Sequence, residues 1–307
     1  METESPGLFH KAKVESHLAL LREASEYFGI EKGRAPQYSQ LLEEFYDQNK
    51  RTPQHLLAYS ESCEITDIYS FWKGVIEEFP GLKEKIRKAL SKGSVLRETE
   101  KIETSSNHAR NLAFTYYLAG TLLSANLAVV VVDGIVRKGA AAHANPDIRF
   151  DWNGTIIDIE CKRPQRESAV ARNLKEATKK LTSKVISEVL GIVALDCSAF
   201  IRPQWNFLDQ YSPERGHDFI SRKMEAVITD PMVLKWNKRI LGVLGYTRVP
   251  AMTRLSQSPI LSAGGGPFSY FRRDSISSFI MVNNERSHDP EILRSVFAAL
   301  KKLFSPI

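Results

Sequence analysis

Residues 145–164 read NPDIRFDWNGTIIDIECKRP, in which two apolar stretches alternate with polar residues on either side of Asn153-Gly154. An Asn-Gly pair in this setting is the strongest short-range signal for a two-residue type I′ hairpin. Because such a turn fixes the register, each residue of the first strand has a defined partner on the second. From the turn outward, the predicted pairs are Trp152 with Thr155, Asp151 with Ile156, Phe150 with Ile157, Arg149 with Asp158, Ile148 with Ile159, and Asp147 with Glu160.

The predicted hairpin has one apolar and one charged face, because successive strand residues point to opposite sides of a sheet. The apolar face holds Ile148, Phe150, Trp152, Ile157, Ile159 and Cys161. The charged face holds Asp147, Arg149, Asp151, Asp158, Glu160 and Lys162. We expect the apolar face to lie in the core and Arg149 to neutralise Asp158.

Asp147 and Glu160 place like charges at directly opposed positions of the hairpin. Opposed Cβ atoms lie only about 4.5–5.5 Å apart, where like charges destabilise a sheet unless they are compensated. On the hairpin itself only Lys162 is near enough, and one ammonium does not easily satisfy two carboxylates. A divalent cation would do so; the alternative is a solvated strand face with ordinary ion pairs.

Pro146-Asp147 and Glu160-Cys161-Lys162 match in full the signature of the PD-(D/E)XK nuclease superfamily, which this hairpin therefore resembles. The resemblance implies a restriction-endonuclease-like α/β core with a central mixed sheet flanked by helices. It also implies that Asp147, Glu160 and the carbonyl of Cys161 hold Mg²⁺ or Mn²⁺, and that Lys162 orients the attacking water. The chemistry agrees, since Mg²⁺ is commonly held by one or two carboxylates and activates water for phosphodiester hydrolysis.

A long, mostly buried helix is predicted over residues 107–127, leading into a buried strand over 128–132. Nucleases of this superfamily often carry a glutamate on that helix as a further metal ligand, in a setting such as Ala-Phe-Glu. Here Ala-Phe is followed by Thr115. The site then uses one ion, or recruits another acid such as Glu103, or is weakly active.

A basic helix is predicted over residues 167–189, followed by a buried strand over 191–196. Val170, Leu174, Ala177, Leu181 and Val185 form its apolar stripe. Beside a metal site, Lys and Arg neutralise backbone phosphates without reading sequence. We therefore expect nucleic-acid contacts from three residues, Arg163, Lys179 and Lys180; the alternative is a solvated helix face.

The whole chain is expected to divide into two domains at a polar stretch. These are a helical N-terminal domain, residues 1–98, and a nuclease-like domain, residues 99–307. In the first, helices are expected over 14–28, 37–48 and 64–90. In the second, beyond the basic helix and its strand, helices are expected over 216–228, 232–241 and 290–304, and strands over 242–249 and 275–282. Target recognition, oligomerisation and partner docking all fit the helical domain. Residues 264–273 begin with a run of glycines and are expected to form a loop.

Composition favours a polyanionic partner for the second part of the chain. The 307 residues are 43% hydrophobic, enough for one large domain or two ordinary ones. Residues 1–100 carry 14 basic and 17 acidic side chains, whereas residues 101–307 carry 28 and 19. The excess positive charge thus accompanies the hairpin.

The cysteine pattern predicts a protein of a reducing compartment, and the hydropathy predicts no membrane-spanning segment. The cysteines, Cys63, Cys161 and Cys197, have no CxxC spacing, so neither zinc nor a disulfide framework is indicated. Residues 1–14 lack the apolar core of a signal peptide, and no apolar run reaches the roughly 18 residues of a membrane helix. We expect a cytoplasmic protein, with a homodimer or a protein partner bound through the helical domain as further options.

These patterns predict a Mg²⁺-dependent nuclease that acts on DNA rather than RNA; the resemblance alone implies bacterial defence or DNA processing. One rival is a weakly active or inactive protein of the same fold that binds nucleic acid as a subunit of a larger complex, which Thr115 favours. Another is an interaction protein whose helical part binds a partner. For that protein Asp147→Ala leaves function unchanged, whereas for the nuclease it abolishes cleavage with folding intact or improved.

Overall fold

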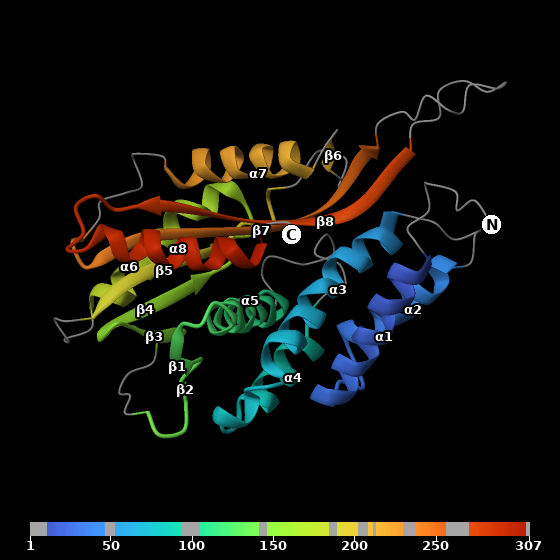
Figure 1. Ribbon diagram of the computed structural model, residues 1–307, viewed down its shortest axis with the longest axis horizontal. Helices are drawn as coiled ribbons and strands as arrows, with labels where there is room; N and C mark the ends of the chain where they lie inside the picture. The colour runs from blue at the N-terminus through green and yellow to red at the C-terminus, as the bar shows by residue number, and fades with distance from the viewer. Residues whose placement is uncertain are drawn as a thin grey trace.

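The computed structural model describes residues 11–46, 53–93, 105–140, 146–183, 189–201, 208–210, 213–229, 237–255 and 270–304. Within these residues the chain is an α/β protein in which helices cover both faces of an eight-stranded mixed sheet (Figure 1). The strands run in the order β2-β1-β3-β4-β5-β7-β6, with β8 paired to β7. The predicted α/β class with a mixed central sheet is confirmed.

The strands are β1 (Ala128–Val132), β2 (Ile135–Val136), β3 (Ile148–Trp152), β4 (Thr155–Lys162), β5 (Leu190–Asp196), β6 (Leu208–Gln210), β7 (Ile240–Leu255) and β8 (Tyr270–Asn283). The helices are α1 (Lys11–Phe28), α2 (Arg34–Tyr46), α3 (Pro53–Trp72), α4 (Leu82–Ser91), α5 (Ser105–Ser124), α6 (Val170–Thr182), α7 (Pro213–Ile228) and α8 (Pro290–Phe304). Two short 3₁₀ turns, η1 (Ile76–Glu78) and η3 (Glu167–Ala169), precede α4 and α6.

The β3–β4 hairpin has the predicted turn and register. Asn153 and Gly154 have φ angles of 50° and 86°, as a type I′ turn requires. The ladder pairs the residues as predicted from Trp152–Thr155 out to Ile148–Ile159, where it ends. Asp147 and Glu160 therefore lie one step beyond the last ladder pair.

Strands β4, β5 and the first half of β7 run parallel, with α6 connecting β4 to β5. The four stripe residues of α6 that the structure describes, Val170, Leu174, Ala177 and Leu181, are buried as predicted. They form one core with α7 and the sheet residues Val193, Leu195, Val243 and Ile280. The helix ends at Thr182, earlier than expected; Val185 lies outside the described residues.

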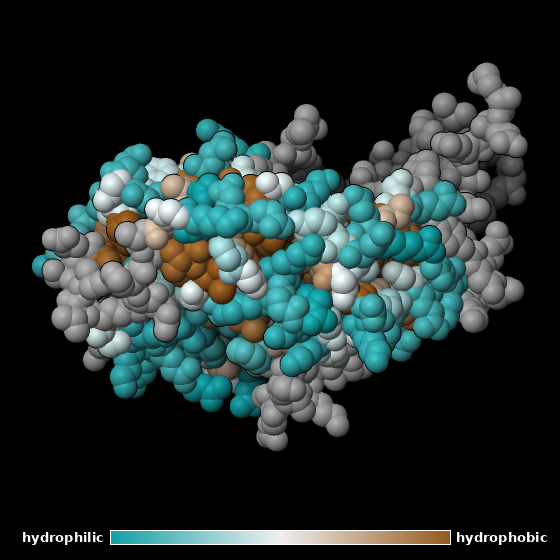
Figure 2. Space-filling view, turned by 90° about the horizontal axis from the view of Figure 1, so that it is seen from below, coloured by the Kyte–Doolittle hydropathy of each residue, from teal (hydrophilic) through white to brown (hydrophobic). Residues whose placement is uncertain are grey.

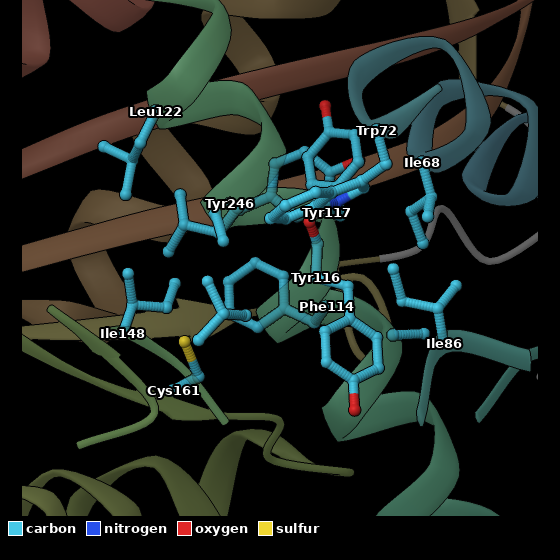
Figure 3. Packing of buried hydrophobic residues seen from close by; sticks show 14 of the residues in the cluster. Ile68, Trp72, Ile86, Phe114, Tyr116, Tyr117, Leu122, Ile148, Cys161 and Tyr246 are labelled. Atoms are coloured by element: carbon cyan, nitrogen blue, oxygen red, sulfur yellow. Dashed lines mark hydrogen bonds between the residues drawn. The ribbon is translucent and has the colours of Figure 1, made fainter. Parts of the chain in front are cut away.

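The opposite face of the sheet is covered by α5, α8 and α3. Aromatic rings fill the space between α5 and β7: Tyr246 stacks on Phe114 at 5.7 Å and lies 4.9 Å from Tyr117, measured between ring centroids (Figure 3). Helices α3 and α5 approach so closely that a Cβ at Gly120 would lie 2.7 Å from the Cβ of Phe71. Glycine is required there because any side chain would clash.

The N-terminal helices share their core with the sheet. One cluster of buried residues includes Leu21 of α1 and Trp72 of α3 together with Phe150 and Ile159 of the hairpin. The expected helix over 64–90 is interrupted, because α3 ends at Trp72 and α4 begins at Leu82. The predicted domain boundary after residue 98 falls outside the described residues.

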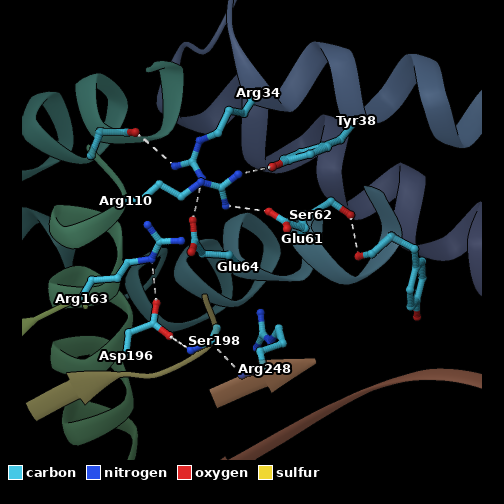
Figure 4. Close-up of polar contacts among 12 residues, drawn as sticks. Arg34, Tyr38, Glu61, Ser62, Glu64, Arg110, Arg163, Asp196, Ser198 and Arg248 are labelled. Atoms are coloured by element: carbon cyan, nitrogen blue, oxygen red, sulfur yellow. Dashed lines mark hydrogen bonds and ion pairs between the residues drawn. The ribbon is translucent and has the colours of Figure 1, made fainter. Parts of the chain in front are cut away.

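Two buried ion pairs join the N-terminal helices to one another and to α5. Arg34 of α2 lies 2.8 Å from Glu64 of α3, and Arg110 of α5 lies 2.8 Å from Glu61 of α3 (Figure 4). Arg110 also donates to the hydroxyl of Tyr38. Both guanidinium groups are fully buried, so this polar network lies inside the helical core.

In the C-terminal part, most predicted elements are present and several are longer. The expected helix over 216–228 lies within α7, and the one over 290–304 is α8. The two expected strands lie within β7 and β8, and β6 was not expected. Residues 270–273, expected in a loop, belong to β8, while 256–269 lie outside the described residues.

The prediction of a helix over 232–241 is wrong for its described part. Residues 237–239 are not helical, and Ile240 and Leu241 begin β7. In a short apolar run that is buried on both faces, the hydrophobic residues show neither helical nor alternating periodicity, so the sequence pattern does not distinguish a strand from a helix. Residues 230–236 lie outside the described residues.

None of the described helices is long and apolar enough to cross a bilayer. The face of the molecule in Figure 2 is mainly hydrophilic, with a hydrophobic patch in the half that contains α5 and α8.

Candidate metal centre

The candidate site lies where β3 begins and β4 ends. Asp147 directly precedes β3, and Glu160, Cys161 and Lys162 are the last residues of β4. Lys180 reaches the site from α6, which contacts β4 and whose apolar stripe packs on residues of β5 and β7. The hairpin turn and the packing of one helix thus bring these side chains together.

Asp147 is held through both its side chain and its main chain. Its Oδ2 accepts a hydrogen bond from the Cys161 N–H at 2.8 Å, and its carbonyl accepts one from the Asp133 N–H at 2.7 Å. The N–H and C=O of a strand residue point to the same side of the strand. The Cys161 carbonyl therefore also faces the side on which Asp147 lies.

Lys180 joins the two carboxylates. Its Nζ lies 3.1 Å from Asp147 Oδ1 and 2.6 Å from Glu160 Oε2. Lys162 Nζ lies 3.0 Å from Glu160 Oε1. Two ammonium groups thus face two carboxylates, whereas the hairpin alone offered only Lys162.

The Glu160 carboxylate lies in an environment that disfavours its charge. Its side chain is 1% exposed, and burial raises its pKa; the neighbouring Asp147 carboxylate raises it further, while Lys180 and Lys162 oppose the shift. Burial by itself would lower the pKa of Lys180, but its hydrogen bond to Glu160 and the charge of Asp147 raise it overall. Lys180 therefore favours the ionised form of Glu160, although burial and Asp147 outweigh it, and Glu160 in turn stabilises the charged form of Lys180.

The charged face of β4 is buried under α6, so the alternative of a solvated strand face does not hold for its central residues. Asp158 and Glu160 are each 1% exposed. Arg149 donates to both oxygens of Asp158, at 2.6 and 3.0 Å, as predicted. This pair is complete without a ligand, which leaves Asp147 and Glu160 as the acids open to a further cation.

Thr115 lies on the other face of the sheet from the carboxylates. It hydrogen-bonds the side chain of Cys161, which points into the core, whereas Glu160 and Lys162 point to the opposite face. A glutamate at position 115 would thus lie beside the Cys161 thiol. Glu103, the other acid considered, lies outside the described residues.

The three residues predicted to contact nucleic acid occupy different environments. Arg163 is buried, with its Nε 3.1 Å from Asp196 Oδ2, so its guanidinium faces the interior rather than the surface (Figure 4). Lys179 is exposed on α6. Lys180 is partly exposed but bound to the carboxylates. At the end of β4 the Arg163 side chain turns inward, where Asp196 balances its charge, and its contact with nucleic acid stays a prediction.

The donor atoms at this site fit a hard divalent cation. Asp147, Glu160 and the Cys161 carbonyl supply oxygen only, and Mg²⁺ prefers oxygen ligands and retains several waters. Within the described ranges, no cluster of three or more His, Cys, Asp or Glu side chains is placed to hold a metal. The candidate ligands are therefore two carboxylates, which both contact the Lys180 ammonium, and one backbone oxygen.

Comparison of the chain with protein-family models, with curated proteins and with solved structures finds no match. The resemblance to PD-(D/E)XK nucleases thus depends on the signature residues of the sequence alone.

Proposed function

We propose that this protein is a metal-dependent nuclease with a restriction-endonuclease-like core that hydrolyses phosphodiester bonds in DNA. The observation that carries the proposal is the convergence of Asp147 and Glu160 on a single cation position, at the end of a hairpin that also carries Lys162. Two carboxylates at the end of a hairpin, next to lysines, form an arrangement suited to a metal ion and a phosphate together.

In the proposed active state, Asp147, Glu160 and the Cys161 carbonyl hold Mg²⁺ or Mn²⁺ in place of the Lys180 ammonium. The bound ion supplies an activated water and stabilises charge on the phosphoryl oxygens. Glu160 enters this state ionised, because a divalent cation offsets the burial that raises its pKa. The Cys161 N–H orients Asp147 Oδ2, and Asp147 Oδ1, which here faces Lys180 Nζ, would be the oxygen offered to the ion.

Lys162 has the position required for contact with the substrate. Its side chain is 25% exposed while its Nζ stays 3.0 Å from Glu160 Oε1, so it reaches both the carboxylate and the solvent. There it hydrogen-bonds the attacking water and offsets charge on the scissile phosphate. Lys180, once released from the carboxylates, joins exposed Lys179 as a phosphate contact.

A specific observation favours a second candidate, an inactive protein of the same fold that binds nucleic acid as a subunit. Lys180 and Lys162 together already balance the two carboxylates, and the described residues offer no third acid at the site. A site balanced in this way is stable without a metal. The two candidates differ in whether a divalent ion displaces Lys180.

Cleavage assays separate these candidates. We would incubate the full chain with linear DNA, circular DNA and RNA in Mg²⁺, Mn²⁺ or EDTA, and compare Lys162→Ala with Lys175→Ala, which changes an exposed lysine on the same helix as Lys180. The nuclease proposal expects metal-dependent cleavage that Lys162→Ala abolishes and Lys175→Ala retains. Nucleic-acid binding without cleavage in either metal would support the second candidate.

A further inference from the structure

A cavity of about 430 Å³ lies far from the candidate metal centre, between α7, β8 and α8. Its walls include the consecutive β8 residues 277–281. The side chains of neighbouring strand residues point to opposite faces of a sheet. Five consecutive residues can therefore line the same cavity only if the cavity runs along the edge of the strand. The cavity is therefore a trough along β8, with α7 on one side of the sheet and α8 on the other.

The backbone of β8 presents hydrogen-bonding groups to this trough. β8 pairs with β7 without a break in register, and the Asn284 N–H donates to the Leu241 carbonyl. The main-chain N–H and C=O groups of successive strand residues point alternately to the two edges of the strand, so those of even-numbered β8 residues point toward β7. The N–H and C=O groups of odd-numbered residues such as Ser277 and Met281 face the trough.

The two walls of the trough differ in chemistry. Toward α7, Ser278 contacts Ser221, and the exposed carboxylates of Asp218 and Glu225 line the cavity. Toward α8, the lining is largely apolar, with Met281 and Phe297 packed at the margin of the core and Lys301 at the end. An incoming strand would direct alternate side chains to these two walls.

We infer that β8 is a docking site for an extended peptide segment of a partner protein, in which basic residues alternate with apolar ones. The peptide adds a strand to the sheet, its main chain bonding to the β8 edge and its alternate side chains giving specificity. The basic side chains lie against Asp218 and Glu225 of α7. The apolar side chains lie against the α8 wall.

Charge favours such a peptide over a second copy of this chain. A two-fold axis perpendicular to the sheet, which pairs two β8 edges antiparallel, would place both α7 helices on the same face of the combined sheet. Asp218 and Glu225 of one copy would then face those of the other, and like charges across an interface are costly. A basic strand meets complementary charge instead.

Fluorescence anisotropy with two labelled octapeptides, one alternating Lys with Val and one alternating Glu with Val, tests this inference on the full chain. The Lys-Val peptide should bind at least about tenfold more tightly, because the α7 wall is acidic. The net charge of the protein is +6, which by itself would favour the Glu-Val peptide. Hydrogen exchange should show slower exchange at Ser277 and Met281 when the peptide is bound.

Charge reversal supplies the matched variants. Asp218→Lys with Glu225→Lys should reverse the preference between the peptides, whereas Glu26→Lys with Glu77→Lys, at exposed positions of α1 and η1, should leave it unchanged. Equal binding of both peptides, an unchanged preference after reversal, or binding without protection of β8 would each overturn the inference. The inference would also be overturned if sedimentation without peptide detected a dimer and hydrogen exchange at β8 were slowed in that dimer.

Discussion

The backbone N–H of Asp133 donates a hydrogen bond to the carbonyl oxygen of Asp147, with 2.7 Å between the two atoms. Asp133 lies in the β1–β2 turn, and its carboxylate binds Lys85 Nζ of α4 at 3.0 Å and the Tyr116 hydroxyl of α5 at 3.0 Å. A continuous set of contacts therefore leads from the N-terminal helices to one proposed metal ligand.

Loss of the Lys85 contact should weaken metal binding at the proposed centre more than it weakens the fold. Lys85→Ala removes an ion pair whose lysine is 40% exposed, so the free energy of unfolding should fall by only about 0.5 kcal/mol. Mn²⁺ affinity, measured by calorimetry, should fall several-fold, because the turn that holds Asp147 loses one anchor. Lys88→Ala, which breaks an exposed pair with Glu84, is the control. Equal affinities for both variants would show that Asp133 holds Asp147 without help from α4.

Replacement of Lys180 should have opposite effects on stability and on metal affinity. Lys180→Met removes the ammonium between Asp147 and Glu160, so the metal-free protein should lose about 1 kcal/mol of unfolding free energy. Without this internal competitor, Mg²⁺ should bind more tightly. Thermal unfolding with and without Mg²⁺ measures both effects, and Lys179→Met, one residue earlier on α6, is the control. A variant whose midpoint does not respond to Mg²⁺ would argue against the metal centre.

The raised pKa of Glu160 predicts a pH dependence of stability. Burial, followed by the charge of Asp147, makes the folded state hold the Glu160 proton more tightly than the unfolded chain does. Between the unfolded pKa and the raised folded pKa, the folded state binds more protons, so the free energy of unfolding falls as the pH rises through this window. Glu160→Gln lacks the group and should lack this decline.

Urea unfolding in EDTA, from about pH 4 to pH 8, should therefore show the wild type losing stability relative to Glu160→Gln as the pH rises. A relative gain instead would mean that Lys162 and Lys180 lower the pKa of Glu160 below its unfolded value.

The buried ion pair between Arg110 and Glu61 should be among the most sensitive contacts of the helical core. Arg110→Met removes the guanidinium that lies 2.8 Å from the buried Glu61 carboxylate, which should cost about 3–5 kcal/mol. Arg22→Met, in the exposed pair with Glu43, should cost less than about 1 kcal/mol. Urea unfolding of both variants checks the contrast. A cost for Arg110→Met as small as that of the exposed pair would show that water reaches Glu61 in the variant.

Local features of the chain were predictable because local chemistry determines them. Asn153-Gly154 adopts the two positive φ angles of its turn, and the alternation of apolar residues then places Ile148 and Ile159 opposite each other. The apolar stripe of α6 could be predicted for the same reason. The helix expected over 232–241 failed because the run that begins β7 has no helical or alternating period.

The sequence by itself determined the hairpin, its register and the closeness of Asp147 to Glu160, since a two-residue turn leaves no freedom in the pairing of its strands. Only the tertiary structure decided which cations face those carboxylates. Lys180 reaches them, and Arg163 turns inward to Asp196, because α6 and β5 pack on β4 in one orientation. That orientation depends on the burial of apolar side chains distant in the chain, which no local pattern records.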